Sequence, residues 1–248
     1  YSIGAVANGI KTDTYTFFLL FFYSNIIGLN PALAGSAIFI ALCVDAVTDP
    51  LMGTISDRTN SSYGRRHPFM MISFIPMSLG YIFLFAPRQD WDMSQSDLFI
   101  WMTIFTVITR IGMTLFDIPH RAFGGEVTKN YKERTILMSW REMFGWVAGL
   151  SNAFLGYGVF FASTPEYPQG QLNPDAWFPF AVTGAIFMIV SVLYSSLSTK
   201  DEIKSLSKWS GSISLLDIFN ELKIAIGNKS FLIFFFGNLF LSLAWGLA

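Results

Sequence analysis

Seven apolar stretches, each long enough to form a membrane-spanning helix, constrain this sequence more than any other feature. A helix needs ~20 mostly apolar residues to cross the hydrocarbon core of a bilayer. Only 13% of the 248 residues are charged, which is about half the share found in soluble domains. The sequence therefore predicts an all-α, polytopic membrane protein. The expected spans are residues 3–28, 31–56, 68–87, 97–120, 136–162, 177–198 and 230–248.

The distribution of lysine and arginine among the connecting segments predicts the orientation of the chain. Cytoplasmic loops of membrane proteins carry an excess of these two residues. The turns after the second, fourth and sixth spans are rich in them, whereas the turn around Arg88 and the segment 163–176 carry mostly carboxylates. The sequence therefore predicts a multi-pass protein of the cell membrane whose N-terminus and 199–229 segment are cytoplasmic.

The polar segment 199–229 divides the chain into unequal parts. It contains apolar residues at helical spacing, and Ser214 followed by Asp217 resembles a capping pair. We expect an amphipathic helix at the cytoplasmic surface, in a linker between two bundles. Residues 1–198 would form an N-terminal bundle of six spans, and residues 230–248 the start of a C-terminal bundle. The first and last residues both lie in apolar stretches, so we expect a segment of a longer protein.

Two carboxylates in the second span are the strongest functional signal. Asp45 and Asp49 are four residues apart and share one face of a helix. A charge at membrane depth costs ~2.5–3.5 kcal/mol on insertion scales, so such residues face a cavity or a partner. Two like charges this close favour a bound cation or a proton, and their oxygens suit a hard ion such as Na⁺. We interpret the pair as a cation site. The alternative is that Arg110 or Arg141 neutralises the pair in fixed bridges.

Other residues within the spans are candidate substrate ligands. Thr114 lies on the same helix face as Asp117, whose carboxylate could bind a cation, sugar hydroxyls or Arg141. Asp13 lies midway along the first span, where it could form hydrogen bonds to a substrate or a bridge to another helix. Tyr15 is a candidate for stacking on a sugar ring.

The basic turn after the second span is a candidate gate. Carboxylate and guanidinium groups there could latch one helix end to another in one state of a carrier and release it in the other. The alternative is that the arginines only anchor the turn on the cytoplasmic side. The residues of this turn are Gly53, Asp57, Arg58, Gly64, Arg65 and Arg66.

These residues also carry a resemblance to known carriers. The basic turn resembles the cytoplasmic signature of the major facilitator superfamily. Two further motifs are similar to those of the glycoside–pentoside–hexuronide:cation symporters within that superfamily, and the resemblance covers essentially the whole chain. The motifs read Gly53-x-x-x-Asp57-Arg58 with Gly64-Arg65-Arg66, Asp45-x-x-x-Asp49-Pro50-x-x-Gly53, and Asp117-Ile118-Pro119 with Ala122, Glu126, Glu133-Arg134 and Arg141.

The resemblance implies a twelve-span carrier with two six-helix bundles, alternating access and a sugar site where the bundles meet. It implies a cation site at Asp45 and Asp49 with Thr114 as a hydroxyl ligand, and the two carboxylates would hold Na⁺ if sodium is the coupling ion. It also implies that Asp117 binds the sugar and that Arg141 is its charged partner.

Two positions differ from a galactoside-transporting member of that family. Gly9 stands where that protein has a sugar-binding aspartate, and the nearest carboxylate here is Asp13. Arg121 stands where it has a tryptophan that stacks on the sugar. An arginine facing the cavity would suit an acidic sugar such as a hexuronide, whereas the same residue could also lie at the cytoplasmic edge.

We therefore expect a secondary active transporter that couples symport of a sugar or glycoside to Na⁺ or H⁺, not an enzyme, with no cofactor besides the coupling ion. The expected partners are the sugar, the cation, the bilayer and the C-terminal half of the same protein, and no nucleic acid. The alternative keeps the fold and carries a lipid-like or other non-sugar solute. An enzyme is disfavoured because His67 and His120 lie at span edges without a nucleophile or metal spacing around them.

Overall fold

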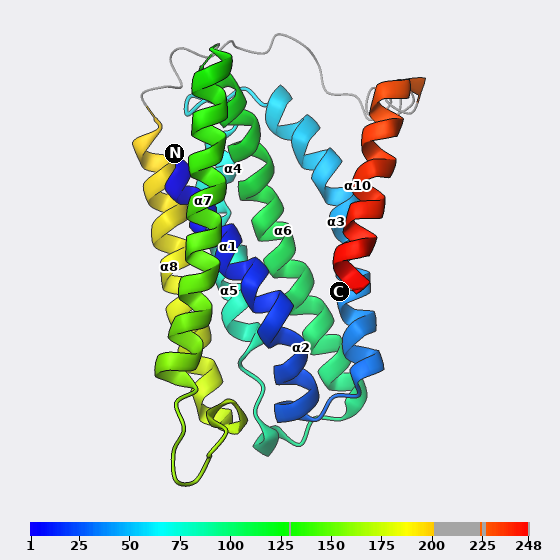
Figure 1. Ribbon diagram of the computed structural model, residues 1–248, viewed down its shortest axis with the longest axis vertical. Coiled ribbons are helices and arrows are strands. Elements are labelled where there is room, and N and C mark those ends of the chain that lie inside the picture. The colour runs from blue at the N-terminus through cyan, green and yellow to red at the C-terminus, as the bar shows by residue number, and fades with distance from the viewer. Residues whose placement is uncertain (129, 201–223, 225–226, 248) are drawn as a thin grey trace. The chain divides into compact units, whose positions relative to one another are not determined.

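Figure 1 shows a computed structural model of the chain, which describes residues 1–128, 130–200, 224 and 227–247. These residues form helices joined by short turns and contain no strand. The chain divides into two compact units, Tyr1–Trp209 and Ser210–Ala248. In the second unit α10 covers Lys229–Leu247, which coincides with the apolar stretch predicted from residue 230. The amphipathic helix predicted around Ser214 and Asp217 lies outside the described residues.

The predicted first span is helical from Ser2 to Ile27, but it is not one regular α-helix. Gly28 ends it in the left-handed conformation, at φ 84°, which glycine adopts without strain. The π-helical turns hold more residues per turn than an α-helix, so faces predicted from regular spacing are offset after Asp13. The elements are η1 (Ser2–Gly4), α1 (Ala5–Asp13), the π-helical η2 (Thr14–Phe18), α2 (Leu19–Phe21) and the π-helical η3 (Phe22–Ile27).

Five helical stretches among the described residues are long and apolar enough to cross a membrane. They correspond to the second to sixth predicted spans. They are α3 (Pro31–Arg58), α4 (His67–Ile72) with α5 (Phe74–Leu84), α6 (Gln95–Val127), α7 (Tyr131–Leu155) with the π-helical η5 (Gly156–Phe160), and α8 (Trp177–Ser198). Short 3-10 turns, η4 (Gln89–Trp91), η6 (Gly170–Leu172) and η7 (Pro174–Ala176), lie in the connections.

Two predicted boundaries were wrong. α6 continues to Val127, past the predicted end at residue 120, and α7 begins at Tyr131 rather than at residue 136. The prediction ended each span with its apolar residues, whereas a helix continues through polar residues where its end leaves the apolar layer. Asn130 caps α7, because its side chain accepts a hydrogen bond of 3.0 Å from the amide of Lys132.

Helix packing in the first unit places one face of α3 against α6. α1 packs on α7 and α8, and α5 packs between α6 and α8. α1 and α7 approach closely at Gly9, where a Cβ atom would lie only 2.0 Å from the carbonyl oxygen of Gly145. Only 17% of the apolar window of α3 is buried, against 50% for the span that contains α8. The main neighbour of α3 is α6, and much of the rest of its surface is exposed.

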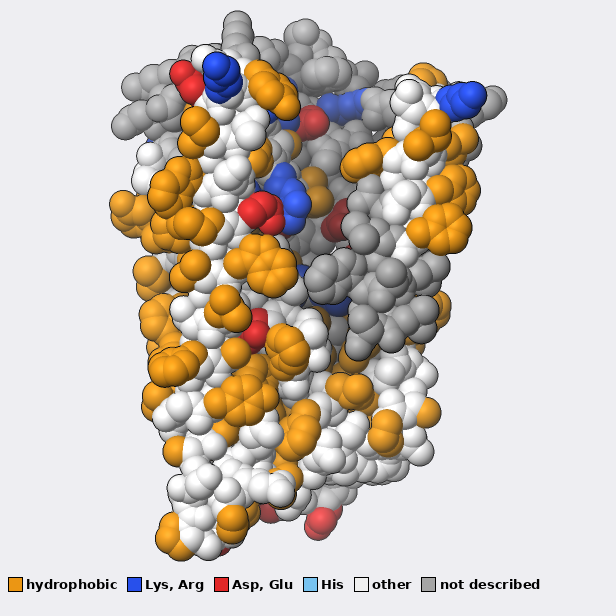
Figure 2. All heavy atoms as spheres, viewed as in Figure 1, with side chains coloured by type: hydrophobic (Ala, Val, Ile, Leu, Met, Phe, Trp, Pro, Cys, Tyr) orange, Lys and Arg blue, Asp and Glu red, His pale blue; other side chains and the backbone are white. Residues whose placement is uncertain are grey.

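The outer surface of the first unit is apolar along its helices. Figure 2 shows apolar side chains over the helix surfaces, and charged side chains near both ends and in a group part-way along the helices. On α7 the exposed residues Trp146, Leu150 and Phe154 follow one another at a spacing of four, so they form one apolar stripe. This pattern is the reverse of a soluble surface and suits contact with lipid or with other helices in a membrane.

Candidate functional site

Two residues of α3 face two residues of α6 across the interface of these helices. Asp49 accepts a hydrogen bond of 2.6 Å from the Thr114 hydroxyl. Asp45 accepts a hydrogen bond from the guanidinium of Arg110 and forms an ion pair with it. The spacing is four residues on each helix, so both contacts repeat with the helical turn. The alternative weighed for the sequence, an arginine bridge, holds for Asp45, while Asp49 is bound by a hydroxyl.

These four side chains belong to a small cavity of about 80 Å³. The space suits a small ion with a few water molecules. Asp45 Oδ1 is buried and has no hydrogen-bond partner among the described residues. A carboxylate oxygen that is buried without a hydrogen-bond partner in the protein can bind an ion or a water molecule. The cavity is lined by Asn8, Lys11, Asp45, Asp49, Arg110, Met113, Thr114, Asp117 and Ile118.

Asp117 lies at the edge of this cavity and is held by two arginines. It forms an ion pair with the buried Arg141 of α7 and a second one of 2.6 Å with Arg121. Arg141 also donates a hydrogen bond of 2.6 Å to Glu142. Arg121 is half-exposed, with 51% of its side chain accessible. The structure thus brings together all three residues that were predicted around the substrate on α6 and α7.

The ring of Tyr15 lies against two cationic side chains of the cavity, Arg110 and Lys11. The guanidinium of Arg110 lies 5.3 Å from the centre of its ring, and the Lys11 ammonium lies 5.9 Å from it. Both distances are in the range of cation–π attraction. Tyr15 was predicted to stack on a sugar. In the structure its ring makes cation–π contacts with two side chains of the protein. Arg110 was considered in the sequence only as an alternative partner of the two carboxylates, and Lys11 was not among the predicted site residues.

Asp13, the predicted substrate ligand of the first span, does not line the cavity. Its carboxylate accepts a hydrogen bond of 2.9 Å from the side chain of Asn152 on α7. Asn152 also bonds Thr14 at 3.1 Å, and Thr14 shares a bond of 2.7 Å with Tyr81. The contacts therefore form the bridge to other helices that was the alternative for Asp13. Sequence spacing could not identify Asn152, because it lies far along the chain.

Gly9 has a packing role that explains its lack of a side chain. Its Cα faces the backbone of Gly145, and no Cβ atom fits between them. An aspartate at this position, as in the galactoside transporter described above, would require the two helices to separate. The close approach of α1 and α7 thus leaves no room for an aspartate at position 9.

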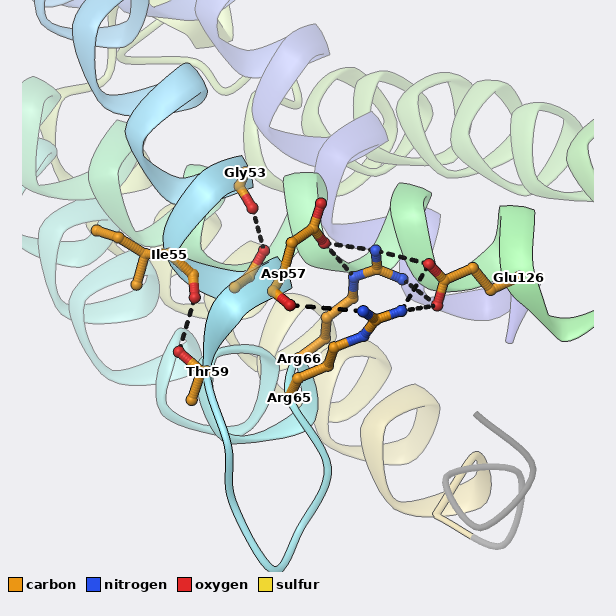
Figure 3. Close-up of polar contacts among 8 residues, drawn as sticks. Gly53, Ile55, Asp57, Thr59, Arg65, Arg66 and Glu126 are labelled. Atoms are coloured by element: carbon orange, nitrogen blue, oxygen red, sulfur yellow. Dashed lines mark hydrogen bonds and ion pairs between the residues drawn. The ribbon is translucent and has the colours of Figure 1, made fainter. Parts of the chain in front are cut away.

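Charged side chains also connect the ends of α3, α4 and α6 (Figure 3). Asp57 accepts hydrogen bonds of 3.0 and 2.5 Å from Arg66, whose side chain is only 5% exposed. Glu126, which was not a predicted site residue, forms ion pairs of 2.6 Å with Arg65 and 2.8 Å with Arg66. We call Asp57, Arg65, Arg66 and Glu126 the turn cluster.

The remaining residues of the predicted gate shape the same turn. Gly64 has φ 80°, which favours glycine. Gly53 lies in α3, where its carbonyl accepts a hydrogen bond of 3.1 Å from Ser56. Arg58 is the last residue of α3. The predicted turn residues thus lie where α3 ends and α4 begins, as the sequence suggested.

Comparison with known proteins assigns the chain to a family of transporters. Over residues 1–248 the chain matches the family described as MFS/sugar transport protein. An uncharacterized symporter of Synechocystis sp. is 32% identical over 207 residues, which cover 82% of this chain and 37% of that protein. The sodium-dependent lysophosphatidylcholine symporter 1-A of Danio rerio is 30% identical over 66% of this chain and 31% of its own length. A glucuronide carrier protein homolog of Escherichia coli is 25% identical over 67% of this chain and 36% of its own.

The chain spans less than half of the length of these relatives. The match over all of its residues confirms the resemblance to the major facilitator superfamily that the motifs suggested. The membrane-length helices agree with that result and indicate a multi-pass membrane protein. The chain belongs to the MFS/sugar transport protein family, a family of membrane transporters.

Proposed function

We propose that the whole protein is a symporter of the cell membrane that couples uptake of a sugar or glycoside to a cation. The observation that carries this proposal is the carboxylate pair of α3 facing a hydroxyl of α6 across a small cavity. Carboxylate and hydroxyl oxygens are the ligands that hard monovalent cations prefer. The unpartnered Oδ1 of Asp45 supplies a free ligand atom at this place.

Coupling requires that the state which binds the cation also binds the sugar most tightly. The dependence is then reciprocal, so the sugar raises the affinity for the cation by the same factor. Asp45, Asp49 and Thr114 would bind the ion, while Asp117, which lines the cavity, and its ion-pair partner Arg141 would form part of the sugar site. Because about 80 Å³ is far below the ~300–1,000 Å³ of ligand pockets, the rest of the sugar site would come from the other bundle.

The turn cluster would serve as the cytoplasmic latch of this carrier. It ties the end of α3 to the start of α4 and the end of α6 by ion pairs that can break in a second state. The excess of arginine and lysine at this end supports a cytoplasmic placement.

An acidic sugar is the first substrate to test. Arg121 is half-exposed and is bound to Asp117 from the same helix, so its guanidinium can contact a carboxylate-bearing substrate near Asp117. The similarity to a glucuronide carrier homolog supports the same choice.

The test is uptake by the full-length protein in vesicles, driven by a sodium gradient, a proton gradient or neither. We expect Asp49→Asn to abolish the cation-stimulated part of sugar uptake, because it removes the charge that binds the ion. Asp90→Asn is the matched control, since Asp90 lies in an exposed turn with 71% of its side chain accessible. Unchanged cation dependence in Asp49→Asn would refute the proposed site.

A lipid-like cargo is the second candidate. The similarity to a lysophosphatidylcholine symporter favours it, because that relative is 30% identical over 66% of this chain. The two candidates separate in a thermal-shift screen of the full-length protein against sugars and lysolipids, since a bound ligand stabilises the folded state. Stabilisation by lysolipids alone would select the second.

A further inference from the structure

Arg110 occupies a position in the cavity that a free cation would be expected to take. Its guanidinium donates to Asp45 Oδ2, and only 12% of its side chain is exposed. The ring of Tyr15 lies 5.3 Å from the guanidinium and supports it. The side chain is therefore held by a carboxylate and an aromatic face, both inside the first unit.

A guanidinium keeps its charge at every physiological pH. A sodium ion that takes ligands from both carboxylates must therefore displace Arg110 from Asp45 or share Asp45 with it. Sharing brings two like charges within a few ångströms in a poorly hydrated site, which is unfavourable. Displacement leaves a buried guanidinium without its partner, which is costly as well.

The net charge of the cavity also disfavours binding of Na⁺. Asp117 is already bound by Arg121 and Arg141. The other charged residues of the lining are Lys11 and Arg110, which are positive, and Asp45 and Asp49, which are negative. Their charges balance, so an added Na⁺ would leave the cavity positive. Without Arg110 the same cavity would carry one negative charge, which a single Na⁺ would neutralise.

We propose that Arg110 is a tethered cation that sets the ion selectivity of this transporter by competing with Na⁺ for Asp45. This inference rests on the proposed cation site. It assigns weak sodium binding to the natural protein and attributes it to one residue, which sequence motifs around Asp45 and Asp49 do not reveal.

The test measures sodium binding by the full-length protein. Thermal unfolding is followed over a range of NaCl concentrations, with choline chloride keeping the ionic strength constant. We expect Arg110→Gln to lower the sodium concentration for half-maximal stabilisation by about tenfold or more, the effect of removing one nearby like charge. Arg110→Lys keeps the positive charge and should retain the weak sodium response of the natural protein.

Arg88→Gln is the control, because it removes an arginine whose ion pairs, with Asp90 and Asp175, lie in exposed turns away from the cavity. It should leave the sodium response unchanged. Arg110→Ala replaces Arg110→Gln if the latter elutes as an aggregate, and the double variant Arg110→Gln with Asp49→Asn should lose the sodium response. Equal or weaker sodium binding in the charge-removing variants than in the natural protein overturns the role of Arg110.

Failure of the proposal for Arg110 can be distinguished from failure of the proposed symport function. Sugar uptake that depends on no cation gradient refutes symport, whatever Arg110 does. Strong sodium-driven uptake by the natural protein, together with no gain in sodium affinity in Arg110→Gln, supports symport and refutes the tethered cation.

Discussion

At the residue scale, the absence of a side chain at Gly9 allows α1 and α7 to pack closely. The backbones of α1 and α7 meet at Gly9 and Gly145 because neither residue carries a Cβ atom. In a membrane, helices gain little from apolar burial and associate mainly through close packing, so small residues mark such contacts. This contact also positions Asp13 next to Asn152, one turn further along the same interface.

Gly9→Ala should therefore destabilise the protein. The added Cβ would lie 2.0 Å from the carbonyl oxygen of Gly145, so the two helices must move apart. Overpacking of this kind typically costs about 1–3 kcal/mol. We expect a lower thermal unfolding temperature in detergent. The matched control is Gly35→Ala in α3, where a Cβ would meet no atom within 4 Å; equal unfolding temperatures for the two variants would contradict the packing argument.

At the element scale, α3 is attached to its neighbours by several polar contacts. It has few buried residues, and its main packing partner is α6. Its C-terminal end is attached through Asp57 to Arg66, and the same turn is attached through Arg65 and Arg66 to Glu126 at the end of α6. The end of this helix is therefore held by charges, which can be exchanged between states more readily than a packed core.

Glu126→Gln should loosen the turn between α3 and α4. The substitution removes the charge that neutralises two arginines, one of which is almost fully buried. Losing one partner of such a pair leaves a poorly compensated charge. We expect faster amide hydrogen exchange over residues 59–66, measured by mass spectrometry. In the control Glu133→Gln, which removes a carboxylate bonded to the Thr128 hydroxyl at 2.6 Å, exchange in this turn should not change.

At the scale of the whole molecule, the ion pairs show which connections share an end of the bundle. The turn cluster joins the α3–α4 turn to the end of α6. At the other end, Arg88 forms an ion pair of 3.1 Å with Asp175 and joins the turn after α5 to the one before α8. Among the described residues, the basic turn after α3 thus lies at the same end as the turn after α6, as the distribution of arginine and lysine in a membrane protein with a fixed orientation requires.

This grouping predicts the result of cysteine labelling. Cys43 is the one cysteine of this sequence, so Cys43→Ser, together with replacement of any cysteine in the rest of the full-length protein, provides a background for single-cysteine variants. A membrane-impermeant maleimide should label Ser163→Cys in intact cells and Ser62→Cys only in inverted vesicles. The opposite pattern would reverse the proposed orientation.

Much of the architecture was predictable because it depends on local features. The length of each apolar stretch defines the spans, and Asn30 before Pro31 marks the start of α3, where the Asn30 side chain accepts a hydrogen bond of 2.9 Å from Ala32. The spacing of Asp45 and Asp49 placed both on one helix face. The turn residues around Gly64 were predictable for the same reason.

The partners of the charged residues were decided by tertiary structure. Arg110 meets Asp45, and Asn152 meets Asp13, because the helices pack at one particular rotation and axial shift. Apolar faces in a membrane specify that rotation only weakly, since lipid and helix are similarly apolar. The sequence by itself thus determined which segments span the membrane and which carboxylates they carry, whereas the packing of the helices, through close contacts such as Gly9 on Gly145, decided what lies opposite each carboxylate.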